Sequence, residues 1–224
     1  MTDPLTLYRS ARTRMLQLTT EAGDEARRRT VPACPEWSTH DLIAHCVSMP
    51  AAIAAGDLPG DDLDGWLDAI RATRADRSIE ELAAEWESVD DTIAAMVSGG
   101  GGVLLDDLVV HEHDLRSALG RPDHSVLDAD VFVPRALQSC VPELERRGLG
   151  AIEVRHADSV WRSHDAPTGW VLEVSPWEAV RVLYSRRTEA ELLALGGASD
   201  VTPYLRLLDD HLPLPITSLG EQGE

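Results

Sequence analysis

Acidic residues and histidines stand among Leu and Val in the stretch DDLVVHEHDLRSALG, residues 106–120. The stretch has the length of an ordinary helix, in which residues four apart lie side by side. Asp107 and His111 would then be neighbours, and Asp114 would return to nearly the same face. That face also carries the apolar residues, where an ionisable group is costly unless it is paired or bound to a metal.

A second histidine has the same character. His45 falls between Leu42 and Met49 on the inward side of another expected helix. Two imidazoles and one carboxylate from two facing helices would leave positions open on a bound ion, as in catalytic metal sites. The set His45, Asp107 and His111 suits Zn²⁺ best and also fits Fe²⁺ or Ni²⁺. Asp114 would orient a ligand or hydrogen-bond the substrate.

The competing interpretation is a hydrogen-bonded core histidine beside an ordinary Asp-His helix contact. Glu112 and His113 are expected to point away from the inward face. Cys34, in VPACPEW, is either a reactive thiol near a helix N-terminus or a residue that packs with Trp37 in a loop. Packing is the expectation.

Helical periodicity dominates the first half of the chain. Four main helices are expected, and they suggest an antiparallel bundle. Capping-box patterns at Ser38 and Ser78 begin the second and third, and Pro50 should kink or end the second. The third is expected as one helix over residues 78–96, and four glycines, residues 99–102, separate it from the fourth.

The pattern of apolar residues changes from helical to strand-like after Gly148. Residues 151–157, the Trp161 segment and residues 169–175 resemble short strands, the last expected to pair as a hairpin with the strand before it. The sequence therefore predicts an α+β, mainly α fold. A helical bundle would span residues 1–148 and a small α+β domain residues 149–224.

Composition excludes several classes of partner. The formal net charge of −19 and the pI near 4.7 disfavour nucleic acid and anionic membranes, which attract clustered cations. No apolar run is long enough to span a bilayer, and MTDPLTLYRS lacks the regions of a signal peptide, so a cytoplasmic protein is expected. Three irregularly spaced cysteines disfavour a disulfide framework.

Three segments together carry a family resemblance. VPACPEWSTHDLIAHC, the 106–120 stretch and SPWEAVRVLYSRRTEAELLAL resemble, in order, the signatures of the mycothiol-dependent maleylpyruvate isomerase family. The resemblance covers nearly the whole chain. It implies a DinB-like metal-binding four-helix bundle followed by a small α+β, sterol-carrier-like module. The absence of Lys and Asn is consistent with a GC-rich, actinobacterial source.

The resemblance also implies roles for individual residues. The metal ligands fall on His45, Asp107 and His111, although the isomerase itself has Glu at the acidic position. The catalytic arginine falls on Arg186, which would neutralise a substrate carboxylate. Asp114, placed on the inward face by helical spacing, is expected to be a second catalytic residue. Arg187 is the competing alignment and is assigned to the cofactor.

The expected function is a metal-dependent isomerase or S-transferase that uses mycothiol on a small electrophilic acid, as a monomer or weak dimer. In that chemistry the thiol adds to an activated double bond, permits rotation and then leaves. Two alternatives stay open: a metal-dependent hydrolase, and a metal- or small-molecule-binding protein without catalysis.

Overall fold

The computed structural model describes residues 3–99, 102–196 and 200–221, except the side chain of His211. Its fold is α+β and mainly helical. Part of the glycine break at residues 99–102 lies outside the described residues. The chain divides into two compact units, Thr2–Asp123 and His124–Glu224.

The division lies before the helix Ala129–Arg147 (α7), not after residue 148 as the sequence predicted. The physical reason is packing. Helix α7 contacts the helix Pro176–Leu183 (α8) and two strands of the second unit, so its apolar face belongs to the core of that unit.

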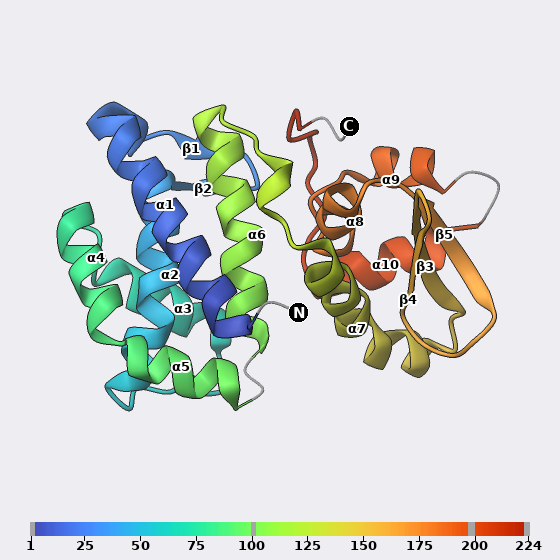
Figure 1. Cartoon of the computed structure of the whole chain (residues 1–224), viewed down its shortest axis with the longest axis horizontal. Coiled ribbons are helices and arrows are strands. Elements are labelled where there is room, and N and C mark those ends of the chain that lie inside the picture. The colour runs from blue at the N-terminus through green and yellow to red at the C-terminus, as the bar shows by residue number, and fades with distance from the viewer. Residues whose placement is uncertain (1–2, 100–101, 197–199, 222–224) are drawn as a thin grey trace. The chain divides into compact units, whose positions relative to one another are not determined.

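The N-terminal unit contains helices and one two-stranded ribbon (Figure 1). Its described elements are α1 (Pro4–Ala26), β1 (Thr30–Val31), β2 (Cys34–Ser38), α2 (Thr39–Ala54), α3 (Leu63–Ala72), α4 (Ile79–Ser88), α5 (Asp90–Ser98) and α6 (Gly102–Leu119). In Figure 1, α1, α2 and α6 run next to one another, and contacts join all three.

Local signals account for most of the helix boundaries in this unit. Capping boxes at Ser38 and Ser78 begin α2 and α4, as expected. Helix α2 continues through Pro50 to Ala54 instead of ending there. The expected third helix is two helices, because the backbone leaves helical geometry at Val89, and α4 and α5 are separate.

Helix α6 is buried on nearly every side. It contacts α1, α2, α5 and β1. Glu112 and His113, expected to face outward, are 0% and 3% exposed. The expectation was wrong because it assumed a helix with one solvated face. The carboxylate of Glu112 is instead satisfied by Arg14 of α1, at 2.7 and 2.6 Å, and by Arg116, at 3.0 and 2.9 Å.

The C-terminal unit surrounds a small sheet with helices. Its described elements are a 3₁₀ turn (His124–Val126), α7, β3 (Ala151–His156), β4 (Ser159–Arg162), β5 (Thr168–Glu173), α8, α9 (Glu189–Leu195) and α10 (Thr202–His211). Trp170 of β5 is fully buried and lies 5.5 Å, between ring centroids, from Tyr204 of α10.

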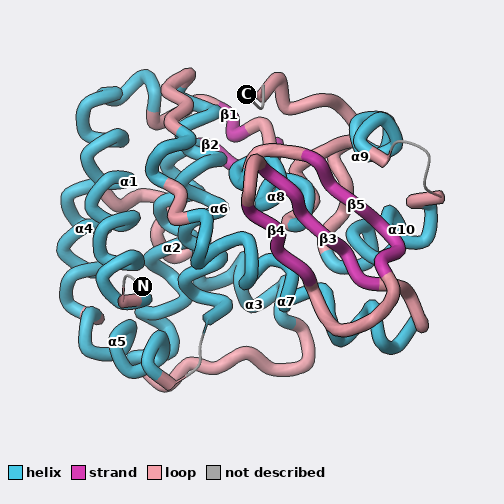
Figure 2. Tube along the Cα trace, turned by 45° about the vertical axis from the view of Figure 1, so that its right-hand side comes forward, coloured by secondary structure: helices cyan, strands magenta, loops and turns pink. Residues whose placement is uncertain are grey.

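The sheet has the order β4-β3-β5, as Figure 2 shows in magenta. β3 pairs with β4 as an antiparallel hairpin and with β5 in parallel. The expected hairpin between β4 and β5 is therefore wrong. β3 has four consecutive buried residues and suits the central position, whereas β4 is largely exposed and suits an edge.

No single helix among the described residues is long and apolar enough to cross a membrane, and only the bent pair α5 and α6 passes that test together, by length and composition.

Candidate metal centre

Three ionisable side chains of the N-terminal unit converge on one point. His45 comes from α2, and Asp107 and His111 come from α6. One ligand atom from each lies within 4.8 Å of the other two. This is the ligand set that the spacing and the family resemblance predicted, and its geometry could hold a metal ion.

Local structure explains why these side chains meet. Asp107 and His111 are one helical turn apart, so both project from the same face of α6. The capping box of Ser38 and Asp41 fixes the first turn of α2, and His45 lies one turn after Asp41. Contacts between α2 and α6 then bring the two histidines together, with ring centroids 5.1 Å apart.

The separations match those of a small tetrahedral site. Nε2 of His45 lies 3.5 Å from Oδ2 of Asp107, and Nε2 of His111 lies 3.3 Å from Oδ1. Nitrogen and oxygen ligands about 2.1 Å from Zn²⁺ at the tetrahedral angle are about 3.4 Å apart. The two histidines face different oxygens of Asp107, so this carboxylate presents one oxygen to each imidazole.

The centre is closed on its histidine side and partly open on its acidic side. His45 and His111 are 6% and 7% exposed, whereas the side chain of Asp107 is 25% exposed. A fourth ligand would therefore approach beside Asp107. Three protein ligands with an accessible further position are typical of catalytic zinc sites, in contrast to closed structural ones.

Asp107 and the two histidines interact strongly through their charges. Burial favours the neutral acid, but the imidazoles of His111 and His45 outweigh it and hold the pKa of Asp107 well below its usual range. Burial also lowers the pKa of His111, but Asp107 and Asp114 outweigh that effect and raise it to about 9. A divalent cation would take the place of the proton that these carboxylates hold on His111.

Asp114 lies on the opposite edge of the His111 ring. Its Oδ2 is 3.0 Å from Nδ1 of His111, and its side chain is fully buried. A proton on Nδ1 that is donated to Asp114 leaves the Nε2 lone pair directed at Asp107 and His45. Asp114 thus has the geometry of a carboxylate that orients a metal-binding histidine.

Trp37 covers the histidines and was not predicted as part of the centre. Its ring centroid lies 4.8 Å from that of His45 and 6.0 Å from that of His111. The guanidinium of Arg71 lies 5.3 Å from the Trp37 ring and donates to Asp41 at 2.8 Å. Trp37 lies on β2, one residue before the N-cap of α2. Its closeness in sequence to the helix that carries His45 was the signal that could have placed it at the centre.

The two predicted arginines belong to the C-terminal unit and have contacts of their own. Arg187 donates twice to Glu178, at 2.6 Å each, and once to Glu221 at 2.8 Å. Arg186 donates to the carbonyl oxygen of Tyr184 at 2.8 Å. Both side chains are buried, at 8% exposed for Arg186 and 4% for Arg187.

Comparison with protein-family models, with characterised proteins and with solved structures finds no match to this chain in any of the three.

Proposed function

We propose that the chain is a metal-dependent enzyme that uses a low-molecular-weight thiol, as an isomerase or an S-transferase acting on a small electrophilic acid. The observation that carries the proposal is the convergence of His45, Asp107 and His111 on one point with Asp107 partly exposed. The thiol is proposed to be mycothiol, from the resemblance of the three sequence segments to the maleylpyruvate isomerase family.

In this proposal each residue of the centre has a separate task. His45, Asp107 and His111 would hold the ion, with Zn²⁺ preferred for two nitrogens and one oxygen. The bound ion would supply positive charge that lowers the pKa of the incoming thiol. Asp114 would hold the metal-bound His111 with its proton on Nδ1, and Trp37 would shield both imidazoles from water on one side.

The arginines are proposed to bind acidic groups, but their contacts differ. Arg187 is held by Glu178 on two nitrogens, which is the arrangement of a structural ion pair. Arg186 donates to the backbone carbonyl oxygen of Tyr184 and stays the proposed partner of a substrate carboxylate, as the family resemblance implies. The assignment of Arg187 to the cofactor is the weaker of the two.

The bundle is proposed to be DinB-like, with α1, α2 and α6 as three of its helices and the broken pair α4 and α5 as the fourth. The partly open centre lies between α2 and α6, the two helices that supply the ligands. We further propose a cytoplasmic protein that acts as a monomer or weak dimer.

Metal content of the purified protein tests the centre. The wild type should hold one zinc ion per chain, and His45→Ala and Asp107→Ala should lose it. His156→Ala and Asp61→Ala, which alter exposed residues, are the matched controls. Asp107→Glu restores the family's acidic residue and should retain zinc. Stoichiometric zinc in both ligand variants would contradict the site.

Thiol chemistry is tested by mass spectrometry. Zinc-loaded protein is incubated with mycothiol and a small electrophilic acid, and adducts and isomerised products are measured. A thiol adduct or isomer formed only by the metal-loaded wild type supports the proposal. Hydrolysis without thiol would favour a metal-dependent hydrolase, and no product with any substrate would favour a protein that only binds metal or small molecules.

A further inference from the structure

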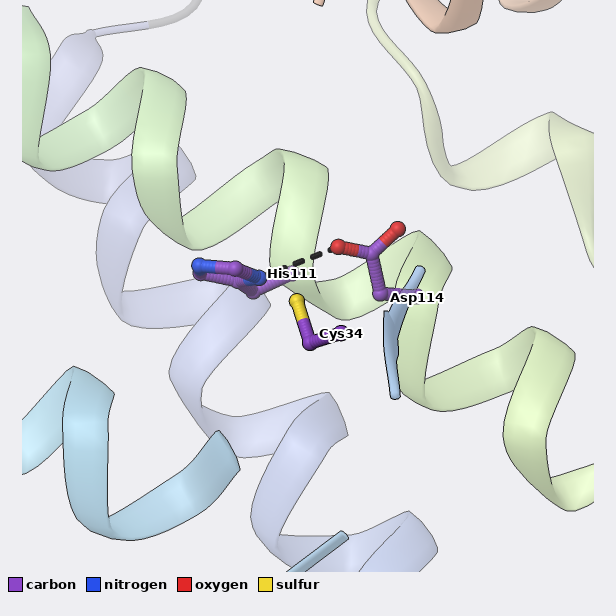
Figure 3. A group of neighbouring side chains, drawn as sticks. All are labelled: Cys34, His111 and Asp114. Atoms are coloured by element: carbon purple, nitrogen blue, oxygen red, sulfur yellow. Dashed lines mark hydrogen bonds and ion pairs between the residues drawn. The ribbon is translucent and has the colours of Figure 1, made fainter. Parts of the chain in front are cut away.

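A second group of ligand-type side chains lies on the other edge of the His111 ring. Figure 3 shows Cys34, His111 and Asp114 together, and one ligand atom from each lies within 4.8 Å of the other two. Asp114 faces Nδ1 of His111, whereas Asp107 faces Nε2. The two groups of ligands therefore share a single imidazole and use its opposite nitrogens.

The ribbon β1-β2 places Cys34 at this edge. Cys34 is the first residue of β2 and pairs with Val31 of β1, and β1 packs against α6. Cys34 is outside any disulfide and is partly exposed, while His111 is 7% and Asp114 0% exposed. A cation would thus reach the position from the side of Cys34, with the buried carboxylate beneath it.

The charges of this group suit a divalent ion. A thiolate from Cys34 and the carboxylate of Asp114 would together neutralise a charge of +2, whereas the group around Asp107 supplies one negative charge. Sulfur is a soft ligand and selects soft or borderline metals over hard ones. We propose that Cys34, His111 and Asp114 form a second metal position, on the Nδ1 edge of His111, that takes a thiophilic divalent cation.

The shared imidazole makes the two positions alternatives. A neutral imidazole has one nitrogen lone pair, so it binds an ion through Nδ1 or through Nε2. Binding at Nδ1 displaces the proton on that nitrogen to solvent and leaves one on Nε2, which lies 3.3 Å from Asp107 and donates to it. The thiol proton of Cys34 is released to solvent. The first metal position thus has nitrogen and oxygen ligands, and the second also has the sulfur of Cys34. Whether an ion prefers sulfur decides which of the two positions it occupies.

Cadmium is the probe, because its bond to a thiolate gives an ultraviolet charge-transfer band, which is measured as the difference from the metal-free protein. Cd²⁺ added to the metal-free wild type should produce the band. His45→Ala should retain it, since His45 belongs only to the other position. Cys34→Ser should lose it, while Cys46→Ser and Cys140→Ser, which alter two buried thiols, should keep it. Asp114→Asn should weaken Cd²⁺ binding by about 10- to 100-fold.

Alkylation of Cys34 in the wild type tests the second metal position without any variant, so it remains informative if a variant misfolds. Iodoacetamide should alkylate Cys34 in the metal-free protein, and Cd²⁺ should protect it, as mapped by peptide mass. A band that is absent from the wild type, that survives Cys34→Ser or that disappears in His45→Ala would overturn the proposal, as would alkylation of Cys34 undiminished by Cd²⁺. None of these results depends on catalysis, so they leave the proposed thiol chemistry untouched.

Discussion

The indole of Trp37 lies against the imidazole of His45, with ring centroids 4.8 Å apart and ring planes inclined by 39°. Trp37, on the ribbon of β1 and β2, thus contacts His45, a candidate metal ligand on the helix that follows the ribbon. The contact makes Trp37 both a wall of the candidate centre and a spectroscopic probe of it.

Trp37 should report metal binding by fluorescence. Co²⁺ bound between His45, Asp107 and His111 would lie close enough to Trp37 to quench its emission. We expect Co²⁺ to reduce tryptophan fluorescence of the wild type and to have little effect on Trp37→Phe. Trp66→Phe, which alters a partly exposed indole on α3 bonded to Asp57, should quench like the wild type. Equal quenching in all three proteins would place the ion elsewhere.

The metal-free protein should lose stability as the pH rises from neutral. The pKa of His111 is raised to about 9 in the folded chain, above its ordinary value near 6.5. The stabilisation from protonated His111 is complete below about pH 6.5 and is lost as the pH rises through about 9. Urea unfolding of metal-free wild type and His111→Gln across this range measures the effect. The difference between the two should shrink toward high pH, and a difference that grows would contradict the assignment.

Glu112 should be among the most sensitive positions of the N-terminal unit. Glu112→Gln leaves the guanidinium groups of Arg14 and Arg116 without their carboxylate in a nearly buried site. The expected loss in the free energy of unfolding is about 3 kcal/mol, the lower end for a broken buried pair, because Arg14 is 31% exposed. Glu21→Gln, in the exposed pair with Arg121, should cost far less, because solvent screens that pair. Urea denaturation followed by circular dichroism compares them.

Arg187 should prove structural. Arg187→Gln removes the cation held by Glu178 and Glu221, all three groups being nearly buried, and should lower the free energy of unfolding by about 3 kcal/mol. Thermal unfolding measures the loss, and calorimetric titration with mycothiol measures cofactor binding. A variant with wild-type stability that no longer binds the thiol would instead support the cofactor role assigned from the sequence.

The part of the site that follows from helical spacing could be predicted. Asp107, His111 and Asp114 share a face of α6 because positions four and seven apart do so in any helix. His45 needed one further assumption, that α2 faces α6. Cys34 could not be placed in the same way, because its approach to His111 depends on the pairing of β1 with β2 and on the packing of β1 against α6.

Errors in the predicted fold have the same origin. Periodicity indicated that α6 has an apolar face but gave no measure of how many neighbours enclose the helix, so Glu112 was placed in solvent. The break at Val89 interrupts an apolar pattern that continues from α4 into α5. Alternation in β5 correctly indicated a strand, yet alternation carries no information about which neighbour it joins or in which direction.

The parallel pairing of β3 with β5 has a consequence for the order of assembly during synthesis. The hairpin of β3 and β4 is complete once residue 162 has left the ribosome, but the other edge of β3 keeps its backbone amides and carbonyls unpaired until β5 follows. This edge is the segment of the nascent chain most prone to pair with another chain, and a chain halted before residue 168 would retain it.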